Sequence, residues 1–303
     1  MEENKLSLER FQKSNLKELM KSGREIREKF SGKKIDLCTI VSGKTGGCPE
    51  DCKFCAQSLH RKGNIPETDL ISREDLFKQA KEMEGKVDRF SIVSSGRSLE
   101  EDFDKVLEYY EDLDKEFSFN ICASHGFLTE EQLKELKVRG VKRYHCNLET
   151  SQSFFPKICS THDYQEKFEM IQKAQKLGYE ICSGGIIGMG ESFQDRWGLA
   201  TTLKELKVDS VPINVLLPQK GTGLEEMEIL SKEEILRTLV MFRHLLPETS
   251  IRFAAGRSLY TDFEEDILNT GIDGLMTGNL LTTIGSDLKR DREILDNLGY
   301  ERK

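Results

Sequence analysis

The sequence has few features of disordered, membrane or secreted proteins. Only six of its 303 residues are proline, and no low-complexity tract is present, which leaves little room for disorder. Its longest apolar runs, such as Ser210–Pro218, are far too short to cross a bilayer. No apolar run follows Met1, so we expect no secretory signal peptide. We therefore expect a cytoplasmic protein that does not associate with a membrane.

The sequence also lacks an excess of basic residues. It contains 45 lysines and arginines against 53 acidic residues, which gives a net charge of −8. A protein that binds the phosphate backbone needs a basic face, so we expect no nucleic-acid partner. Charged residues make up 32% of the chain, which predicts a heavily solvated surface.

Disulfide bonds are not expected either, although the chain has eight cysteines. In a reducing compartment thiols serve as metal ligands or as small buried side chains. Three of the eight lie between Cys48 and Cys55, and this cluster is the strongest signal of chemistry in the sequence. We expect two others, Cys146 and Cys159, to be packed as small apolar residues.

What the sequence does contain is a regular alternation of short β-branched runs and charged amphipathic stretches. Eight strand-then-helix units follow an N-terminal helical segment, roughly Ser7 to Phe30. Such alternation is typical of a parallel sheet covered by helices, and eight units most simply close into a (βα)8 barrel of the TIM type. A doubly wound open sheet is the alternative. No linker divides the chain, so we expect one domain over residues 1–303, with residues 1–34 as a helical extension.

The bounds of the predicted elements follow from these patterns. The strands are Ile35–Ser42, Asp88–Ser95, Phe117–Ser124, Arg143–Glu149, Glu180–Gly188, Ser210–Leu217, Ser250–Ala255 and Gly274–Gly278. The helices between and after them are Ser72–Met83, Leu99–Leu113, Thr129–Val138, Asp163–Leu177, Phe193–Lys207, Ser231–Leu246, Phe263–Asn269 and Asp287–Asn297.

One face of the predicted strands is unusually polar. Residues alternate between two faces along a strand, and in a barrel one of these faces points inward. A barrel interior is normally packed with Val, Ile and Leu, and unsatisfied polar groups there are costly. A local hydrogen-bonded network is one interpretation, but recurrence on seven strands favours a polar cofactor and substrate in the interior. The inner face is predicted to include Cys38, Arg89, Ser91, Asn120, Cys122, His145, Asn147, Glu149, Cys182, Gly184, Ser210, Asn214, Arg252 and Ala254.

The three clustered cysteines follow the first predicted strand, in a loop of the kind that forms barrel active sites. Their spacing, Cys48-x3-Cys52-x2-Cys55, lets three thiolates bind three corners of an iron–sulfur cube and leaves one iron open. A structural zinc site would need a fourth ligand, and His60 is not at the usual spacing. A zinc knuckle and a redox triplet remain the alternatives. Apart from His145, the histidines are expected at polar surface or loop positions. They are His60, His125, His162 and His244.

This cysteine spacing after a first strand resembles the signature of the radical S-adenosylmethionine (SAM) superfamily. The surrounding residues narrow the resemblance to the biotin synthase family, which inserts sulfur into dethiobiotin to form biotin. Similar segments occur in order from about residue 8 to the C-terminus. They are residues 42–58, 144–151, 181–191, 210–214, 251–257 and 280–283.

The resemblance implies a [4Fe-4S] cluster on Cys48, Cys52 and Cys55, with SAM on its open iron. Lys167 falls where the family usually has an arginine near the methionyl carboxylate, and lysine keeps the charge but loses the bidentate fork. The glycine-rich stretch from Gly184 does not have the Rossmann spacing. The residues implied to bind SAM are Phe54, Asn147, Glu149, Lys167, Gly184 and Gly188.

Dethiobiotin is the substrate that the resemblance implies. The amides of Asn147 and Asn214 would pair with its ureido ring, and Thr282 and Thr283 would donate to its valeryl carboxylate. A turn at the exit of a strand is the alternative interpretation of the two threonines.

The family also implies an auxiliary, sulfur-donating cluster, usually [2Fe-2S], deep in the barrel. Cys122, Cys182 and Arg252 match its usual ligands, but the cysteine expected on the second strand is Ser91 here. Cys38 is predicted to face inward on the neighbouring first strand. We therefore hypothesise that the third thiolate has moved from the second strand to the first, which could alter the geometry or the type of the cluster.

Two other classes compete with this interpretation. Radical enzymes of the hydrogenase-maturation or methylornithine type would not account for the deep cysteines and the two asparagines. An iron–sulfur carrier would need neither a polar interior nor the threonine pair. The resemblance further implies a flavodoxin- or ferredoxin-type reductant, cluster-assembly proteins as partners, and a homodimer.

Overall fold

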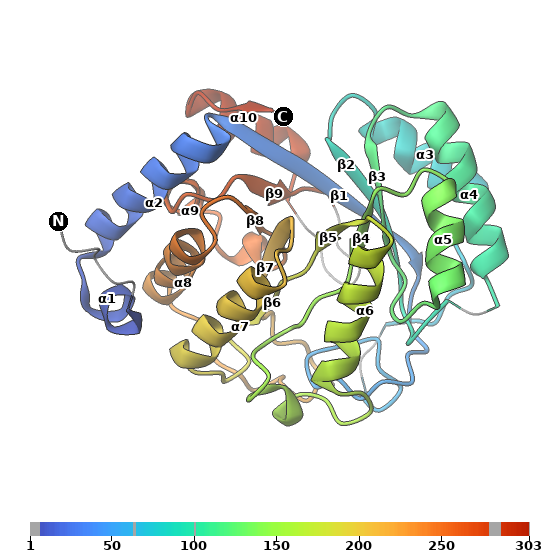
Figure 1. The fold of residues 1–303 in the computed structure, drawn as a ribbon, viewed down its shortest axis with the longest axis horizontal. Coiled ribbons are helices and arrows are strands. Elements are labelled where there is room, and N and C mark those ends of the chain that lie inside the picture. The colour runs from blue at the N-terminus through green and yellow to red at the C-terminus, as the bar shows by residue number, and fades with distance from the viewer. Residues whose placement is uncertain (1–6, 63–64, 100, 279–285, 303) are drawn as a thin grey trace.

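The strands form one sheet that closes on itself (Figure 1). The computed structural model describes residues 7–62, 65–99, 101–278 and 286–302. Neighbouring strands pair in the order β10, β1, β2, β3, β4, β5, β7, β8, β9, and β6 pairs with β7. The strands are β1 (Lys34–Lys44), β2 (Arg89–Ser94), β3 (Asn120–Ser124), β4 (Arg143–His145), β5 (Glu180–Cys182), β6 (Gly185–Ile187), β7 (Ser210–Val215), β8 (Ser250–Phe253), β9 (Gly274–Met276) and β10 (Glu301–Arg302).

Closure of the barrel rests on β1, which pairs in parallel with both β2 and β9. The short strand β10 adds a further parallel pairing at the start of β1. This arrangement confirms the predicted (βα)8 barrel of the TIM type and excludes the open sheet.

Helices surround the barrel, as Figure 1 shows. Three of them begin with a capping box, at Thr129, Asp163 and Ser192, in which side chains satisfy backbone N–H groups that the first turn leaves free. None of the described helices is long and apolar enough to cross a bilayer. The helices are α1 (Leu8–Lys13), α2 (Leu16–Ser31), α3 (Arg73–Met83), α4 (Phe103–Glu116), α5 (Glu130–Val138), α6 (Tyr164–Lys176), α7 (Phe193–Glu205), α8 (Lys232–Leu245), α9 (Glu264–Asn269) and α10 (Leu288–Asn297), with 3-10 helices at Phe155–Lys157 and Arg257–Leu259.

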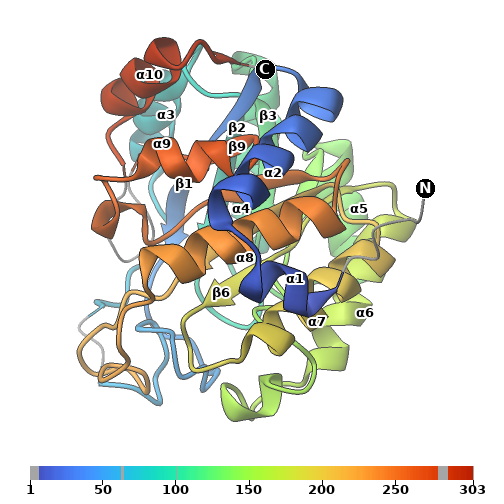
Figure 2. The ribbon, with the colours of Figure 1, turned by 90° about the vertical axis from the view of Figure 1, so that its left-hand side faces the viewer.

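The N-terminal extension contains two helices, α1 and α2. The first ends at Lys13, and Asn15 caps the second, because its side chain accepts hydrogen bonds from the backbone N–H groups of Lys17 and Glu18. Both helices lie against α8 (Figure 2). Arg237 of α8 donates to the carbonyl oxygens of Phe11 and Ser14 at 2.9 and 3.0 Å, which fixes the extension on the barrel.

The predicted strand Glu180–Gly188 is divided into β5 and β6. The division has a steric reason at Gly184, where a Cβ atom would lie 1.9 Å from the carbonyl oxygen of Pro212 in β7. The predicted strand Arg143–Glu149 is shorter as well, because regular pairing ends at His145. Glu149 then adopts a left-handed backbone conformation, with φ at 69°, which a non-glycine residue seldom does.

Strand register places the polar residues on the inner face as predicted. In a parallel sheet, paired residues point to the same side, and Cys38 pairs with Arg89, while Ser91 pairs with Cys122. His145 likewise pairs with Cys182. The alternate residues of these strands pack outward in the hydrophobic core beneath the helices.

Candidate active site in the barrel

A cavity of about 340 Å³ occupies the barrel interior. Its walls are formed mainly by the inner-face residues and by the loop that follows β1. The predicted site residues that line it are Cys38, Phe54, Cys55, Ser91, Cys122, Asn147, Glu149, Cys182, Asn214 and Arg252. The inner face of the strands and the cysteine loop therefore surround one common space.

We call Cys48, Cys52 and Cys55 the loop triplet. Their loop is held by two others, since the Lys53 N–H donates to the Ile158 carbonyl oxygen and the Lys53 carbonyl oxygen accepts from the Gly223 N–H, both at 2.8 Å. These bonds fix the loop over the carboxyl ends of the strands, the end at which barrel enzymes bind their substrates.

The thiols of the loop triplet are partly or fully buried and lie near one another. Burial, together with the neighbouring Cys48, raises the pKa of Cys55 to about 11. Burial also raises the pKa of Cys48, whereas a hydrogen bond with Cys159 is the main cause of the raised pKa of Cys52. Backbone N–H groups donate to the sulfur atoms of Cys48 and Cys55. Thiols with such donors fit an iron–sulfur cluster, whose cysteine sulfurs accept hydrogen bonds of this kind.

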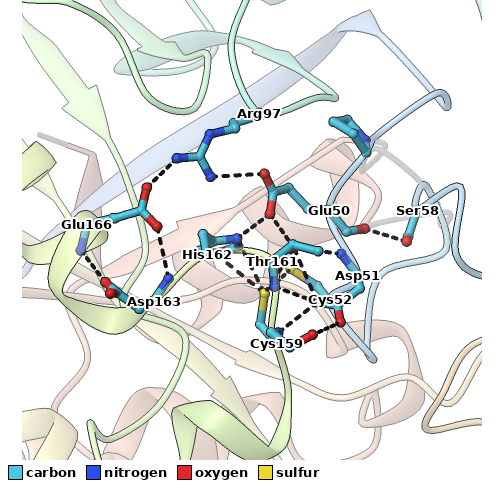
Figure 3. Close-up of polar contacts among 12 residues, drawn as sticks. Glu50, Asp51, Cys52, Ser58, Arg97, Cys159, Thr161, His162, Asp163 and Glu166 are labelled. Atoms are coloured by element: carbon cyan, nitrogen blue, oxygen red, sulfur yellow. Dashed lines mark hydrogen bonds and ion pairs between the residues drawn. The ribbon is translucent and has the colours of Figure 1, made fainter.

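A fourth thiol lies beside the loop triplet (Figure 3). Cys159 is buried, as predicted, but its sulfur lies 3.7 Å from that of Cys52 and 3.3 Å from Nδ1 of His162. His162 and His125 lie in loops, which agrees with the prediction of polar surface or loop positions, but both are buried. For His244 the prediction is wrong, because it lies in helix α8. His125 is enclosed between the Tyr110 and Ser94 hydroxyl groups, at 2.7 and 3.1 Å.

We call Cys38, Cys122, Cys182 and Arg252 the deep set. Each of the three thiols raises the pKa of the arginine, so all four side chains lie within electrostatic range of one another. Burial raises the pKa of Cys38, and it raises that of Cys122 to about 12. Burial opposes ionisation of Cys182 too, but His145 and the nearby arginines outweigh it and lower the pKa to about 6.

Beneath the deep set, ion pairs close the barrel. Asp36 pairs with Arg252 and, at 3.0 Å, with Arg89. Glu180 pairs with Arg89 at 3.2 Å and with Arg143 at 2.8 Å. Nε of Arg252 is buried and has no hydrogen-bond partner among the described residues. An unpaired guanidinium donor next to three buried thiols fits a polar or anionic group held at this level of the barrel.

Asn147 and Glu149 line the cavity near the loop triplet, and Lys167 lies close to Glu149 without contributing to the cavity wall. Asn147 accepts the Gly184 N–H at 3.0 Å and donates to Glu149 at 3.4 Å. Burial opposes the charge on Lys167, but nearby acidic groups, Cys146 first and then Glu149 and Cys52, outweigh it and raise the pKa of the lysine. The structure thus brings these three predicted SAM-binding residues close to the cysteine loop.

The remaining predicted residues either already bond backbone groups, do not line the cavity, or lie outside the described residues. Asn214 lines the cavity, but its amide already bonds backbone groups, donating to the Gly185 carbonyl oxygen at 3.1 Å and accepting the Ala255 N–H at 3.0 Å. Gly184 and Gly188 do not contribute to the cavity wall. The Gly188 N–H instead donates to Glu191 at 2.8 Å. Thr282 and Thr283 lie outside the described residues.

Several residues around the site were given no chemical role in the sequence prediction, although His145 was predicted on the inner face. His145 and Arg143 line the cavity beside Cys182, and Asp36 neutralises the arginines below it. The alternation that assigns Cys38 to the inner face assigns Asp36 there too, so that signal was present. No local pattern indicates that Cys159 and His162 approach Cys52, because this contact depends on the packing of two loops more than a hundred residues apart.

The chain matches two family profiles that adjoin along its length. The profile described as the Radical SAM superfamily matches residues 43–203, and the one described as the Biotin and Thiamin Synthesis associated domain matches residues 212–301. The barrel sheet runs through both segments, since β2 to β6 lie in the first and β7 to β9 mostly in the second, while β1 lies mostly before the first.

Curated relatives and solved structures agree with these profiles. Biotin synthase from Clostridium perfringens (strain 13 / Type A) is 51% identical over 288 residues, covering 94% of this chain and 90% of that protein. Biotin synthase from Clostridium botulinum (strain Hall) is 47% identical over 299 residues, covering 98% and 94%. The crystal structure of methylornithine synthase superimposes with a TM-score of 0.85 at 18% identity over 98% of this chain and 93% of that one. At that identity the structural likeness concerns the fold alone.

Proposed function

The chain belongs to the biotin synthase family of the radical SAM superfamily, and we propose how its own residues divide the work of inserting sulfur into dethiobiotin to form biotin. The observation that supports the division is that two separate groups of thiols reach one cavity, which is lined by Cys55 of the loop triplet and by all three thiols of the deep set. One group lies on a loop at the carboxyl ends of the strands, and the other lies on the strands themselves. A substrate between them would face both.

The loop triplet would hold the [4Fe-4S] cluster, and the deep set would hold the auxiliary cluster. When bound, the [4Fe-4S] cluster with SAM supplies a 5′-deoxyadenosyl radical, and the auxiliary cluster supplies sulfur. The protein's own part is to hold three thiolates at each level and to orient the substrate between them.

SAM would lie against the residues near the loop triplet. Phe54 lines the cavity next to Cys55 and would contact the adenine, while the Asn147 and Glu149 pair would hold the ribose. Lys167 would offer its ammonium group to the methionyl carboxylate. Gly184 and Gly188 would contribute through their backbone, which would run past the adenosyl group of SAM. Their N–H groups donate to Asn147 and Glu191, which holds the backbone in place.

The auxiliary cluster would take Cys38 in place of the usual cysteine at Ser91. Ser91 pairs with Cys122 in the sheet, and Cys38 lies on the adjacent strand β1 at the same level as Arg89. A thiolate is a far better ligand for iron than a serine hydroxyl. The unpaired Nε of Arg252 would face the auxiliary cluster, while Asp36 accepts a hydrogen bond from the other end of the guanidinium group.

Dethiobiotin would lie between the two levels. The amides of Asn147 and Asn214 would bind its ureido ring, although both would do so while keeping bonds to backbone groups. Thr282 and Thr283 would bind the valeryl carboxylate. On the family alone we further propose a flavodoxin- or ferredoxin-type reductant, cluster-assembly proteins as partners, a homodimer, a cytoplasmic location and one domain for the whole chain.

The experiment that tests this function is a single-turnover assay on anaerobically reconstituted protein. With SAM, dethiobiotin and a chemical reductant, biotin should form together with 5′-deoxyadenosine. Formation of 5′-deoxyadenosine without biotin would contradict sulfur insertion and would favour another radical SAM reaction on the same barrel. Absence of both products from protein with a full complement of iron and sulfide would contradict the proposal entirely.

A further inference from the structure

Cys52 belongs to a second arrangement of metal-binding side chains besides the loop triplet. Among the described residues, Cys52, Cys159 and His162 form a group whose ligand atoms all lie within 4.8 Å of one another. The close-up in Figure 3 shows the sulfur atoms and the imidazole directed toward one another. The two segments are tied together independently of any metal, because the Asp51 N–H donates to Thr161 at 3.0 Å and the Ser160 N–H donates to Asp51 at 2.8 Å.

The distances within this group match one tetrahedral ion. Two thiolates that each bind the same Zn²⁺ at about 2.3 Å lie about 3.8 Å apart, and the Cys52 and Cys159 sulfurs are 3.7 Å apart. A thiolate and an imidazole nitrogen on that ion lie about 3.6 Å apart. The Cys159 sulfur lies 3.3 Å from Nδ1 and 3.8 Å from Nε2 of His162, so these two distances bracket that value. Thiolates that bind different irons of a cube are necessarily farther apart, so this geometry favours a single ion.

The surroundings of His162 fit the same interpretation. Its Nδ1 lies 2.6 Å from Oε2 of Glu50 and 3.3 Å from the Cys159 sulfur. Because the carboxylate takes the shorter contact with Nδ1, Nε2 is the nitrogen that a metal would use. A metal-bound histidine usually donates its other N–H to a carboxylate in this way. Glu50 is in turn held by Arg97 at 3.1 Å and by the Thr161 hydroxyl, so the histidine is oriented before any ion arrives.

The electrostatics also favour a thiophilic cation. Two thiolates would neutralise a divalent charge, and the neutral imidazole would add none. Such a site discriminates against Mg²⁺ and Ca²⁺, which prefer oxygen ligands.

We propose that Cys52, Cys159 and His162 form a mononuclear site for a thiophilic divalent cation such as Zn²⁺, with the fourth position left to solvent. Because Cys52 also belongs to the loop triplet, an ion in this site and a cluster on the loop triplet exclude each other. The site itself rests only on the geometry described, whereas the exclusion rests on the proposed function. Zinc would then hold the chain in a form without the cluster.

Cobalt binding tests the site directly. Co²⁺ added to reduced, iron-free full-length protein should give the thiolate charge-transfer and visible bands of a tetrahedral ion, and Zn²⁺ should displace it. Cys159→Ser and His162→Asn should each weaken binding about tenfold or more. Cys55→Ser is the matched control, because it removes a thiol from the same loop but leaves the site intact.

Two results would overturn the proposal. If Cys55→Ser abolishes the cobalt spectrum and Cys159→Ser does not, the ion lies in the loop triplet. If all variants bind as the unaltered protein does, the ion lies elsewhere. Circular dichroism of each variant would show that the fold is retained, and His162→Asn provides an independent result should Cys159→Ser fold poorly.

A reconstitution experiment separates this site from the proposed function. Unaltered protein loaded with Zn²⁺ should take up less iron and sulfide than zinc-free protein, whereas Cys159→Ser should take up the same amount with or without zinc. Equal uptake by the zinc-loaded unaltered protein would contradict the exclusion. Tetrahedral cobalt binding in a protein that never assembles a cluster would support the site and contradict the proposed function.

Discussion

The loop triplet and the deep set position thiols around one cavity by different means. The loop triplet comes from a single loop, so its geometry depends on neighbouring loops that hold Lys53. The deep set comes from four strands, and sheet register fixes where each side chain points. The first arrangement can accept more than one partner, such as Cys159, whereas the second can be altered only by moving a ligand to another strand position.

The largest expected effect comes from removing the loop triplet. Cys48→Ala/Cys52→Ala/Cys55→Ala should reduce SAM cleavage to background, because no other described residues near the loop replace three thiolates at this spacing. The rate of 5′-deoxyadenosine formation measures it. Cys146→Ala is the control, since Cys146 is a core cysteine outside both groups, and its variant should retain cleavage.

The next effect should separate the two levels of the barrel. Cys38→Ser should abolish biotin formation and lower the iron and sulfide content, yet retain SAM cleavage in the presence of reductant. Ser91→Ala, on the adjacent strand, should retain the iron and sulfide of the unaltered protein. Iron and sulfide analysis of both variants checks this. Retained auxiliary iron in Cys38→Ser would show that the third thiolate has not moved to β1.

Removing the charge beneath the deep set should cost stability. Asp36→Asn leaves Arg252 and Arg89 without their shared buried partner, which is expected to cost about 3–5 kcal/mol in the free energy of unfolding. The exposed pair of Arg73 with Asp112 provides the control, because Asp112→Asn should cost about 1 kcal/mol or less. Urea unfolding of both variants measures the difference, and equal losses would contradict the role given to Asp36.

The same aspartate gives a pH dependence of defined sign. Arg252 and the other nearby arginines outweigh burial and lower the pKa of Asp36 in the folded protein. The contribution of Asp36 to the free energy of unfolding is therefore complete above the ordinary pKa of an aspartate, and it is lost as the pH falls through the lowered pKa. Urea unfolding below pH 4 or so should show a smaller difference between the unaltered protein and Asp36→Asn than at neutral pH. A difference that does not shrink on acidification would contradict the sign.

The smallest effect concerns Lys167. Lys167→Arg should lower the KM for SAM only a few-fold, because a guanidinium group can bind a carboxylate through two hydrogen bonds. Lys167→Met keeps most of the side-chain length without the charge and should raise the KM. Steady-state kinetics of SAM cleavage measures these effects. An unchanged KM for SAM in both variants would contradict a place for Lys167 in the SAM site.

Local signals predicted the barrel and most of its polar interior. Alternation along each strand correctly assigns Cys38, Cys122 and Cys182 to one cavity, because the two-residue period of a strand is independent of its neighbours. The break between α1 and α2 and the division at Gly184 were not predicted. Both depend on local contacts, a cap at Asn15 and a close approach to Pro212, that periodicity does not report.

The contact between Cys52 and Cys159 could not be predicted for a different reason. It joins two loops that follow different strands, and strand register says little about where loops cross. The sequence alone suggests only that Cys159 is buried, which it is. Its proximity to the loop triplet depends on hydrogen bonds that join the two loops, which Ser160 and Thr161 donate to Asp51.

The central claim is that the barrel holds two separate iron–sulfur sites. The most direct test is anaerobic iron and sulfide analysis with Mössbauer spectroscopy on the Cys48→Ala/Cys52→Ala/Cys55→Ala protein, compared with the unaltered protein. We predict that the variant keeps iron and sulfide with the spectrum of one cluster type, and that adding Cys38→Ser removes them. A variant that folds but retains no iron or sulfide would contradict the claim and leave a radical enzyme with a single cluster.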